Sequence, residues 1–242
     1  MSCALIIDTE TTGVEEPDVV ELAFAGPLHA FSPPELVIER MRFKPRKPIT
    51  LGALATHHIL DEELEHEELW PGSWAPPEGT DYLIGHNVDF DWKAIGSPAV
   101  KRICTLALAR RLWPNVDSHS LSALTYHFAV DRHRAREELR GAHGAGFDVE
   151  LCLRLLTAIL AAMPKVQSWE RLWDASERAR VPTHLSFGKY GPHETWAKVN
   201  GGPMRCADVR RLDSGYWNWL LEKCDQVRDD PYLRKALTEM HA

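Results

Sequence analysis

Two acidic residues interrupt the first apolar segment of the chain, and this feature constrains the fold more than any other. Residues 4–7 have the β-branched and apolar content of a buried strand, and Asp8 and Glu10 follow at once. Residues two apart on a strand project to the same face, so the two carboxylates converge. Buried like charges are costly unless a cation that prefers oxygen ligands neutralises them. The pattern indicates a divalent metal site, and two solvated acids at a strand end are the alternative.

Composition sets the class of protein. The chain has 242 residues, 44% hydrophobic and 26% charged, which predicts one sizeable core with a small appendage. It shows no targeting pattern and no apolar run of membrane-spanning length, so we expect a cytoplasmic protein that does not contact membranes. Five scattered cysteines without CxxC spacing indicate neither a disulfide framework nor a zinc site.

Net charge argues against one mode of nucleic-acid binding. The formal charge of −7 argues against a broad cationic surface that makes many phosphate contacts. A nuclease remains compatible with this charge, because an acidic centre contributes to the total and bound divalent ions reverse the local sign.

The order of apolar segments predicts an α/β fold. The first three predicted strands form an antiparallel meander, and later strands alternate with helices. This order gives a mixed five-stranded sheet flanked by helices. The predicted strands are 4–7, 19–25, 36–43, 82–86 and 102–105, and the predicted helices are 89–95, 106–112, 121–128 and 148–163. We expect a first domain over residues 1–165, a linker over 166–180 and a small module over 181–242.

Two further polar elements follow later strands. Asn87 and Asp91 come after the strand 82–86, where Asp91 at a helix start is a candidate metal ligand; a turn that caps the helix is the alternative. His143 and Asp148 precede the longest apolar helix and offer a base and a further carboxylate, with an exposed loop histidine and a capping acid as the alternatives. Because three such elements rarely occur together by chance, they predict one catalytic centre.

In order and spacing, these motifs resemble the DEDDh family of 3′→5′ exonucleases. The matching elements are Asp8-x-Glu10, Asn87-x-x-x-Asp91 and His143-x-x-x-x-Asp148. Segments 103–114, 187–190 and 216–220 are similar to the exonuclease X subfamily. The resemblance implies an RNase H-like fold for the first domain and an exonuclease X-like accessory module at the C-terminus.

The resemblance also implies a chemistry. Asp8, Glu10, Asp91 and Asp148 would bind two divalent ions, Mg²⁺ with Mn²⁺ as a substitute, and His143 would be the general base. The expected reaction releases 5′-nucleoside monophosphates from DNA 3′ ends, a chemistry used in DNA repair. An RNA-trimming exoribonuclease and a non-catalytic nucleic-acid-binding scaffold are the alternatives.

Substrate contacts are expected around the first motif. Small residues after Glu10 offer amides and hydroxyls to a terminal nucleotide, and Val14 could stack on a base or wedge against it; a tight turn is the alternative use of the small residues. The predicted substrate-binding residues are Thr9, Thr11, Thr12, Gly13, Val14, His86 and Asn87.

The third motif departs from the family pattern. The family commonly has Arg-Ala-Leu after the histidine, where this chain has Gly144-Ala145-Gly146. The added backbone freedom of glycine predicts a less well positioned His143 and weaker activity.

Overall fold

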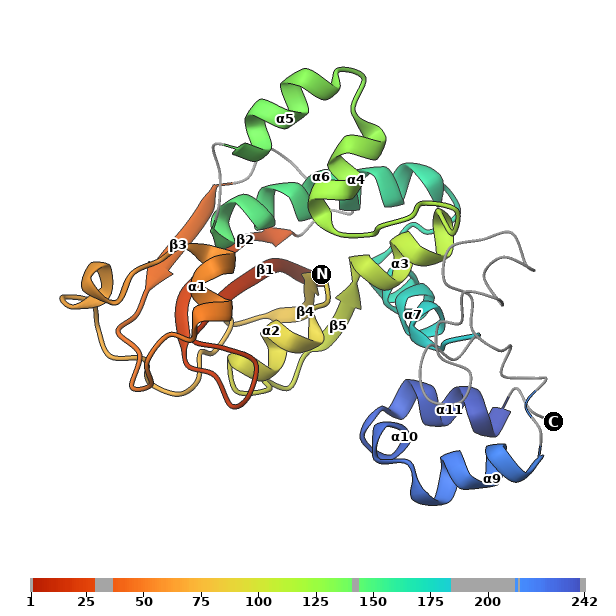
Figure 1. Cartoon of the computed structure of the whole chain (residues 1–242). Coiled ribbons are helices and arrows are strands. Elements are labelled where there is room, and N and C mark those ends of the chain that lie inside the picture. Colours follow the sequence, from red (N-terminus) through yellow and green to blue (C-terminus); the bar gives the residue numbers. More distant parts are fainter. Residues whose placement is uncertain (1, 29–36, 141–143, 184–211, 213, 240–242) are drawn as a thin grey trace. The chain divides into compact units, whose positions relative to one another are not determined.

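The computed structural model describes residues 2–28, 37–140, 144–183, 212 and 214–239 (Figure 1). The chain divides into two compact units, Met1–Ser176 and Glu177–Ala242. The segment 166–180, predicted as a linker, contains a helix, α7 (Trp169–Arg180), whose Trp169 and Leu172 are buried. The assignment of the second unit as an accessory module stays a prediction.

A five-stranded mixed sheet forms the centre of the first unit. Its strand order is β3-β2-β1-β4-β5, with antiparallel pairing from β1 to β3 and parallel pairing from β1 to β5 through β4. The predicted meander and mixed sheet are therefore confirmed. The strands are β1 (Cys3–Thr11), β2 (Val19–Leu28), β3 (Ile38–Arg42), β4 (Thr80–Gly85) and β5 (Lys101–Cys104).

The first strand is longer than the sequence predicted. Pairing with β2 continues past the apolar run to Thr11, which lies opposite Val19, so Asp8 and Glu10 lie within β1 and not at its end. Leu36, the first residue of the predicted strand 36–43, lies outside the described residues.

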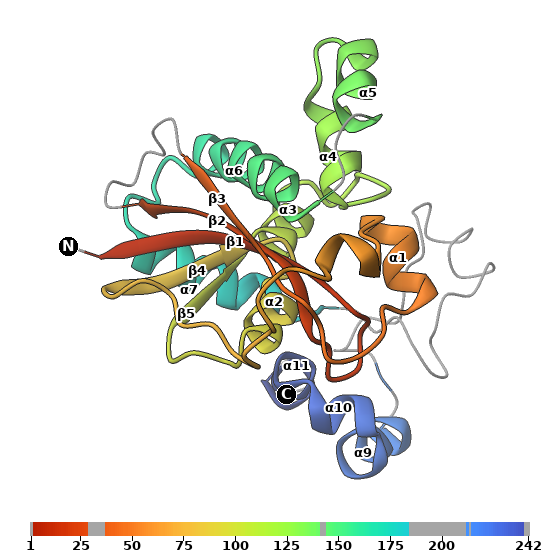
Figure 2. The ribbon, with the colours of Figure 1, turned by 90° about the vertical axis from the view of Figure 1, so that its left-hand side faces the viewer.

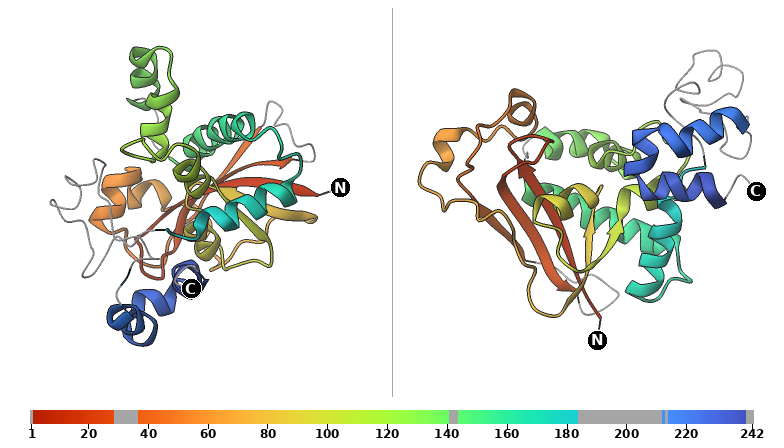
Figure 3. Two further views of the ribbon diagram at one scale, coloured as in Figure 1. Left: turned by 90° about the vertical axis from the view of Figure 1, so that its right-hand side faces the viewer. Right: turned by 90° about the horizontal axis from the view of Figure 1, so that it is seen from below.

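Helices cover the sheet. Helix α6 lies across β1, β2 and β3, and α7 lies beside β4 and β5, where Ser176 Oγ accepts a hydrogen bond from the Cys104 backbone at 2.8 Å (Figures 2 and 3). Helix α6 spans Ala145–Ala162. The remaining helices before it in the chain are α1 (Leu51–His57), a 3₁₀ turn (Asp61–Leu64), α2 (Asp89–Ala94), α3 (Thr105–Leu112), α4 (Leu121–Phe128) and α5 (Arg132–Arg140).

Local sequence explains where key helices begin. Thr50 caps α1, because its side chain accepts a hydrogen bond from the Ala53 backbone at 3.3 Å. Helix α6 begins at Ala145, three residues before the predicted start, with Gly144 as its N-cap and no side-chain cap. Asp148 therefore lies inside the first turn and is not the cap. Similarly, Val88 is the N-cap of α2 and makes no side-chain capping bond.

The second unit has its own small core. Leu220, Val227 and Leu233 are buried in it, and Trp217 Nε1 donates a hydrogen bond to the Leu237 carbonyl at 2.9 Å. The helices are α9 (Ser214–Lys223), α10 (Asp225–Asp229) and α11 (Pro231–Glu239). Across the described residues of both units, we find no helix with the length and apolar content that a membrane span requires.

Candidate metal centre

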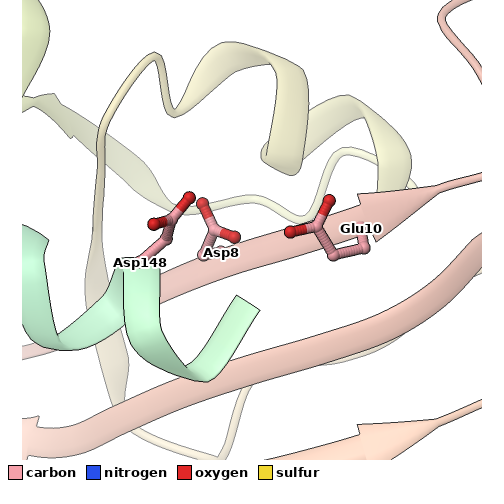
Figure 4. A group of neighbouring side chains, drawn as sticks. All are labelled: Asp8, Glu10 and Asp148. Atoms are coloured by element: carbon pink, nitrogen blue, oxygen red, sulfur yellow. The ribbon is translucent and has the colours of Figure 1, made fainter. Parts of the chain in front are cut away.

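Two strand residues and one helix residue bring their carboxylates together. Asp8 and Glu10 project from the same face of β1, and α6 places Asp148 beside them (Figure 4). One carboxylate oxygen from each of the three lies within 4.8 Å of the others. The structure therefore brings together three of the four predicted metal ligands as a close group.

The fourth predicted ligand, Asp91, enters from α2. Asp91 is buried, and its Oδ1 accepts hydrogen bonds from the Thr9 backbone N–H at 2.9 Å and from Thr9 Oγ1 at 2.7 Å. It lines the same cavity as Asp8, Glu10 and Asp148 but is not a member of the close group of three.

Burial and mutual repulsion disfavour ionised acids at this centre. Burial, followed by the charges of Asp91 and Asp148, raises the pKa of Asp8 well above its usual range. Burial, followed by the charge of Asp148, raises the pKa of Glu10 to about 8. Burial also raises the pKa of Asp91, although the two hydrogen bonds from Thr9 act in the opposite direction. A cation with oxygen ligands would relieve this repulsion, so the residues present fit a divalent metal.

The acids line a cavity of about 610 Å³. Part of its wall comes from α1 and the segment before it, and the sequence predicted no helix at residues 51–57. A threonine followed by a short Ala-containing segment was the available signal, since Thr50 is the N-cap of α1. The residues of this part of the wall are Lys47, Pro48, Thr50, Gly52, Ala53, Thr56 and His57.

The predicted substrate-binding residues also line this cavity, but several hydroxyls have partners within the protein. Thr9 donates to Asp91, Thr11 Oγ1 donates to the Gly13 carbonyl at 2.8 Å, and Thr12 Oγ1 accepts from the Asp18 backbone at 3.1 Å. The last two bonds shape the segment between β1 and β2. Val14 lies in this segment and is 82% exposed.

His86 has both ring nitrogens engaged. Its Nδ1 lies 3.1 Å from Thr105 Oγ1, and its Nε2 lies 2.8 Å from the carbonyl of His119. Burial, the largest effect, lowers the pKa of His86 to about 4, so the ring is neutral at neutral pH. A carbonyl only accepts, so Nε2 carries the proton and donates it to His119. Asn87 has a φ of 73° and forms the turn that leads into α2.

His143, the predicted general base, lies outside the described residues, and its role stays a prediction. The glycines that follow it are explained by neighbours from the sheet. A Cβ added at Gly144 would lie 3.0 Å from Glu21 Oε2, and one added at Gly146 would lie 1.8 Å from Arg40 Nε. Gly144 also has a φ of 143°, which side chains rarely adopt.

The central strand of the mixed sheet carries the paired acids, as the motif resemblance implied. Two of three comparisons with known proteins find similar exonucleases. No family model matches the chain. Exodeoxyribonuclease 10 of Escherichia coli strain K12 is 28% identical over 238 residues, which cover 96% of each chain. The chain is therefore similar to an exodeoxyribonuclease along nearly its whole length, in agreement with the resemblance that its motifs indicated.

Two solved structures share the fold. Exonuclease X in complex with 5′-overhanging duplex DNA has a TM-score of 0.53 and 24% identity, covering 72% of this chain and 99% of that one. A zinc-bound complex of Escherichia coli exonuclease I with single-stranded DNA has a TM-score of 0.53 and 19% identity, covering 72% of this chain and 42% of that one. At these identities the two structures support the fold alone.

Proposed function

We propose that this protein is a metal-dependent 3′→5′ exonuclease that hydrolyses phosphodiester bonds at DNA 3′ ends and releases 5′-nucleoside monophosphates. The observation that carries the proposal is the convergence of Asp8, Glu10 and Asp148 within 4.8 Å in the wall of a cavity. The relative found along nearly the whole chain is named an exodeoxyribonuclease, which supports DNA as the substrate.

Four acids would hold the metal. Asp8, Glu10 and Asp148 form the close group, and Asp91 would add a ligand from the same cavity. The donors are all carboxylate oxygens, which suits Mg²⁺ or Mn²⁺, and we propose two ions. When bound, such ions supply Lewis-acid stabilisation of the charge that develops on the phosphate oxygens.

The protein's own groups provide orientation and proton transfer. The two hydrogen bonds from Thr9 hold the carboxylate of Asp91 in one orientation, and neither involves its second oxygen. His143 would accept the proton of the attacking water, a role for which a histidine pKa near neutrality is suited. The buried and neutral His86 is not a candidate for this role, because both of its nitrogens have protein partners.

The cavity has the features expected for a terminal nucleotide. Its volume of about 610 Å³ lies within the range typical of small-molecule sites. The exposed Val14 offers an apolar surface to a base. Among the described residues that line the cavity, Lys47 is the lysine or arginine that could contact a phosphate. The lining thus offers a phosphodiester acids that would hold metal, an apolar surface and a cationic group.

The test is digestion of a 5′-labelled single-stranded DNA oligonucleotide with Mg²⁺, compared with a matched RNA. We expect a ladder that shortens from the 3′ end of the DNA. Asp8→Asn should abolish it, and His143→Ala should slow it by about 10²–10⁴-fold. Asp117→Asn makes the same change at an exposed residue outside the cavity and should leave the ladder unchanged.

Each alternative gives a different result. Faster shortening of the RNA would make the protein an exoribonuclease. Metal-dependent DNA binding without shortening would favour the scaffold. Shortening from the 5′ end, or full activity of Asp8→Asn, would overturn the proposal.

A further inference from the structure

Glu21 is a buried acid next to the metal centre that belongs to none of the three motifs. It lies on β2 directly opposite Glu10 on β1. Residues directly opposite in an antiparallel pair project from the same face of the sheet, so Glu21 stands beside Glu10 on the face that carries the acids. Only 5% of its side chain is exposed.

The carboxylate of Glu21 is incompletely satisfied. Oε1 lies 3.9 Å from Arg42 Nε, which makes a loose ion pair. Arg42 is shared with Glu63, since Arg42 Nη1 lies 3.4 Å from an oxygen of Glu63. Oε2 is buried and has no hydrogen-bond partner among the residues that the structure describes. A buried carboxylate oxygen without a partner costs free energy, so a structural role alone does not explain this acid.

The free oxygen faces the start of the helix that carries Asp148. Oε2 lies 3.0 Å from the position of a Cβ at Gly144, the N-cap of α6. The absence of a side chain at Gly144 leaves room for the carboxylate. Helix α6 has no side-chain cap, and the positive end of its dipole favours a negative charge there.

We propose that Glu21 is a fifth carboxylate of the cation centre, whose charge beside Glu10 strengthens the binding of a divalent ion. The inference rests on the proposed metal-dependent function. Glu21 is outside the close group of Asp8, Glu10 and Asp148, so it acts through the field it adds to the centre and through the placement of Glu10. It is therefore a positioning residue and not a catalytic one.

Titration of the metal-free full-length protein with Mn²⁺, without nucleic acid, tests the proposal. Glu21→Gln removes the charge and keeps the shape, and we expect Mn²⁺ affinity to fall about tenfold. Glu39→Gln removes a charge from an exposed residue of β3 and should leave the affinity unchanged. Arg42→Met should act in the opposite direction and raise the affinity, because it uncovers the charge of Glu21.

Thermal unfolding of the metal-free variants separates this role from a structural one. Relief of repulsion predicts that Glu21→Gln unfolds at the same or a higher temperature than the unmodified protein. Unchanged Mn²⁺ affinity in both Glu21→Gln and Arg42→Met would overturn the inference, as would lower affinity explained by a matching loss of folded protein.

Asp8→Asn separates a failure of the role of Glu21 from a failure of the metal centre itself. If Asp8→Asn loses Mn²⁺ binding while Glu21→Gln keeps it, the metal centre stands and only the role of Glu21 fails. If Asp8→Asn binds Mn²⁺ as well as the unmodified protein does, the proposed function itself fails.

Discussion

Thr9 donates two hydrogen bonds to one oxygen of Asp91, from its backbone at 2.9 Å and from its hydroxyl at 2.7 Å. The residue between the two acids of the first motif thus holds the acid of the second motif. Both groups are buried, where hydrogen bonds to a charged acceptor are strong. This contact joins β1 to α2 at the point where the acids meet.

Thr9→Val should separate the hydroxyl bond from the backbone bond. Valine keeps the shape and removes Oγ1, so the free energy of unfolding should fall by about 1.5 kcal/mol. Mn²⁺ affinity and the rate of DNA digestion should fall as well, because Asp91 loses part of its orientation. Calorimetric Mn²⁺ titration and urea unfolding measure the two effects.

Thr9→Ser is the matched control, since it keeps the hydroxyl and removes a methyl group. It should recover most of the Mn²⁺ affinity. Equal Mn²⁺ affinities for the valine and serine variants would show that the hydroxyl does not orient Asp91.

The metal-free protein should lose stability as pH rises. The pKa of Glu10 is raised to about 8 in the folded state, so the folded state holds a proton that the unfolded state has released. The stabilising contribution is present below about pH 4.5, the ordinary value for a glutamate, and is lost as pH rises through about 8. Urea unfolding in EDTA should show this loss.

Mg²⁺ should raise the unfolding midpoint more at about pH 8.5 than at about pH 6.5, because it replaces the lost protons. Glu10→Gln should flatten the profile of the metal-free protein. A midpoint that rises with pH in EDTA would contradict the prediction.

His86 should stay neutral well below the ordinary pKa of histidine. The pKa of His86 is about 4 in the folded state, so the unfolded state binds more protons than the folded state between about pH 4 and 6.5. The stability that neutral His86 contributes is therefore present above about pH 6.5 and is lost as the pH falls through about 4. The ring signals in an NMR titration should report a neutral Nε2–H tautomer at about pH 5.5. A protonated ring at that pH would contradict the buried hydrogen-bonded arrangement. Above about pH 6.5, His86 is neutral in both states and adds nothing to the pH dependence of stability.

The sequence predicted the sheet because its strands have strong apolar runs bounded by turn residues. It missed α5, where Ala135 is the buried residue of a nine-residue polar helix, and therefore no apolar stripe was visible. It also missed α1, whose buried residue is His57. Short helices with one buried side chain leave no periodic pattern.

The acids of the centre were predictable because strand spacing brings Asp8 and Glu10 together without any knowledge of the rest of the fold. The partner of Thr9 was not, since Asp91 lies 82 positions away. The same limit applies to His86, whose ring contacts a carbonyl 33 positions away. Contacts of this kind depend on how α2 and the loop before α4 pack, which residue type and spacing do not determine.

Gly146 and Arg40 should be energetically coupled. A Cβ at Gly146 would lie 1.8 Å from Arg40 Nε, so Gly146→Ala must displace the guanidinium from the start of α6. Alanine is otherwise favoured over glycine inside a helix by about 1 kcal/mol. In an Arg40→Ala background, Gly146→Ala should therefore stabilise the protein by about that amount, whereas in the unmodified background it should give little gain or a loss. Urea unfolding of the four proteins measures the coupling. Equal stabilisation in both backgrounds would mean that Arg40 does not pack against this turn of the helix.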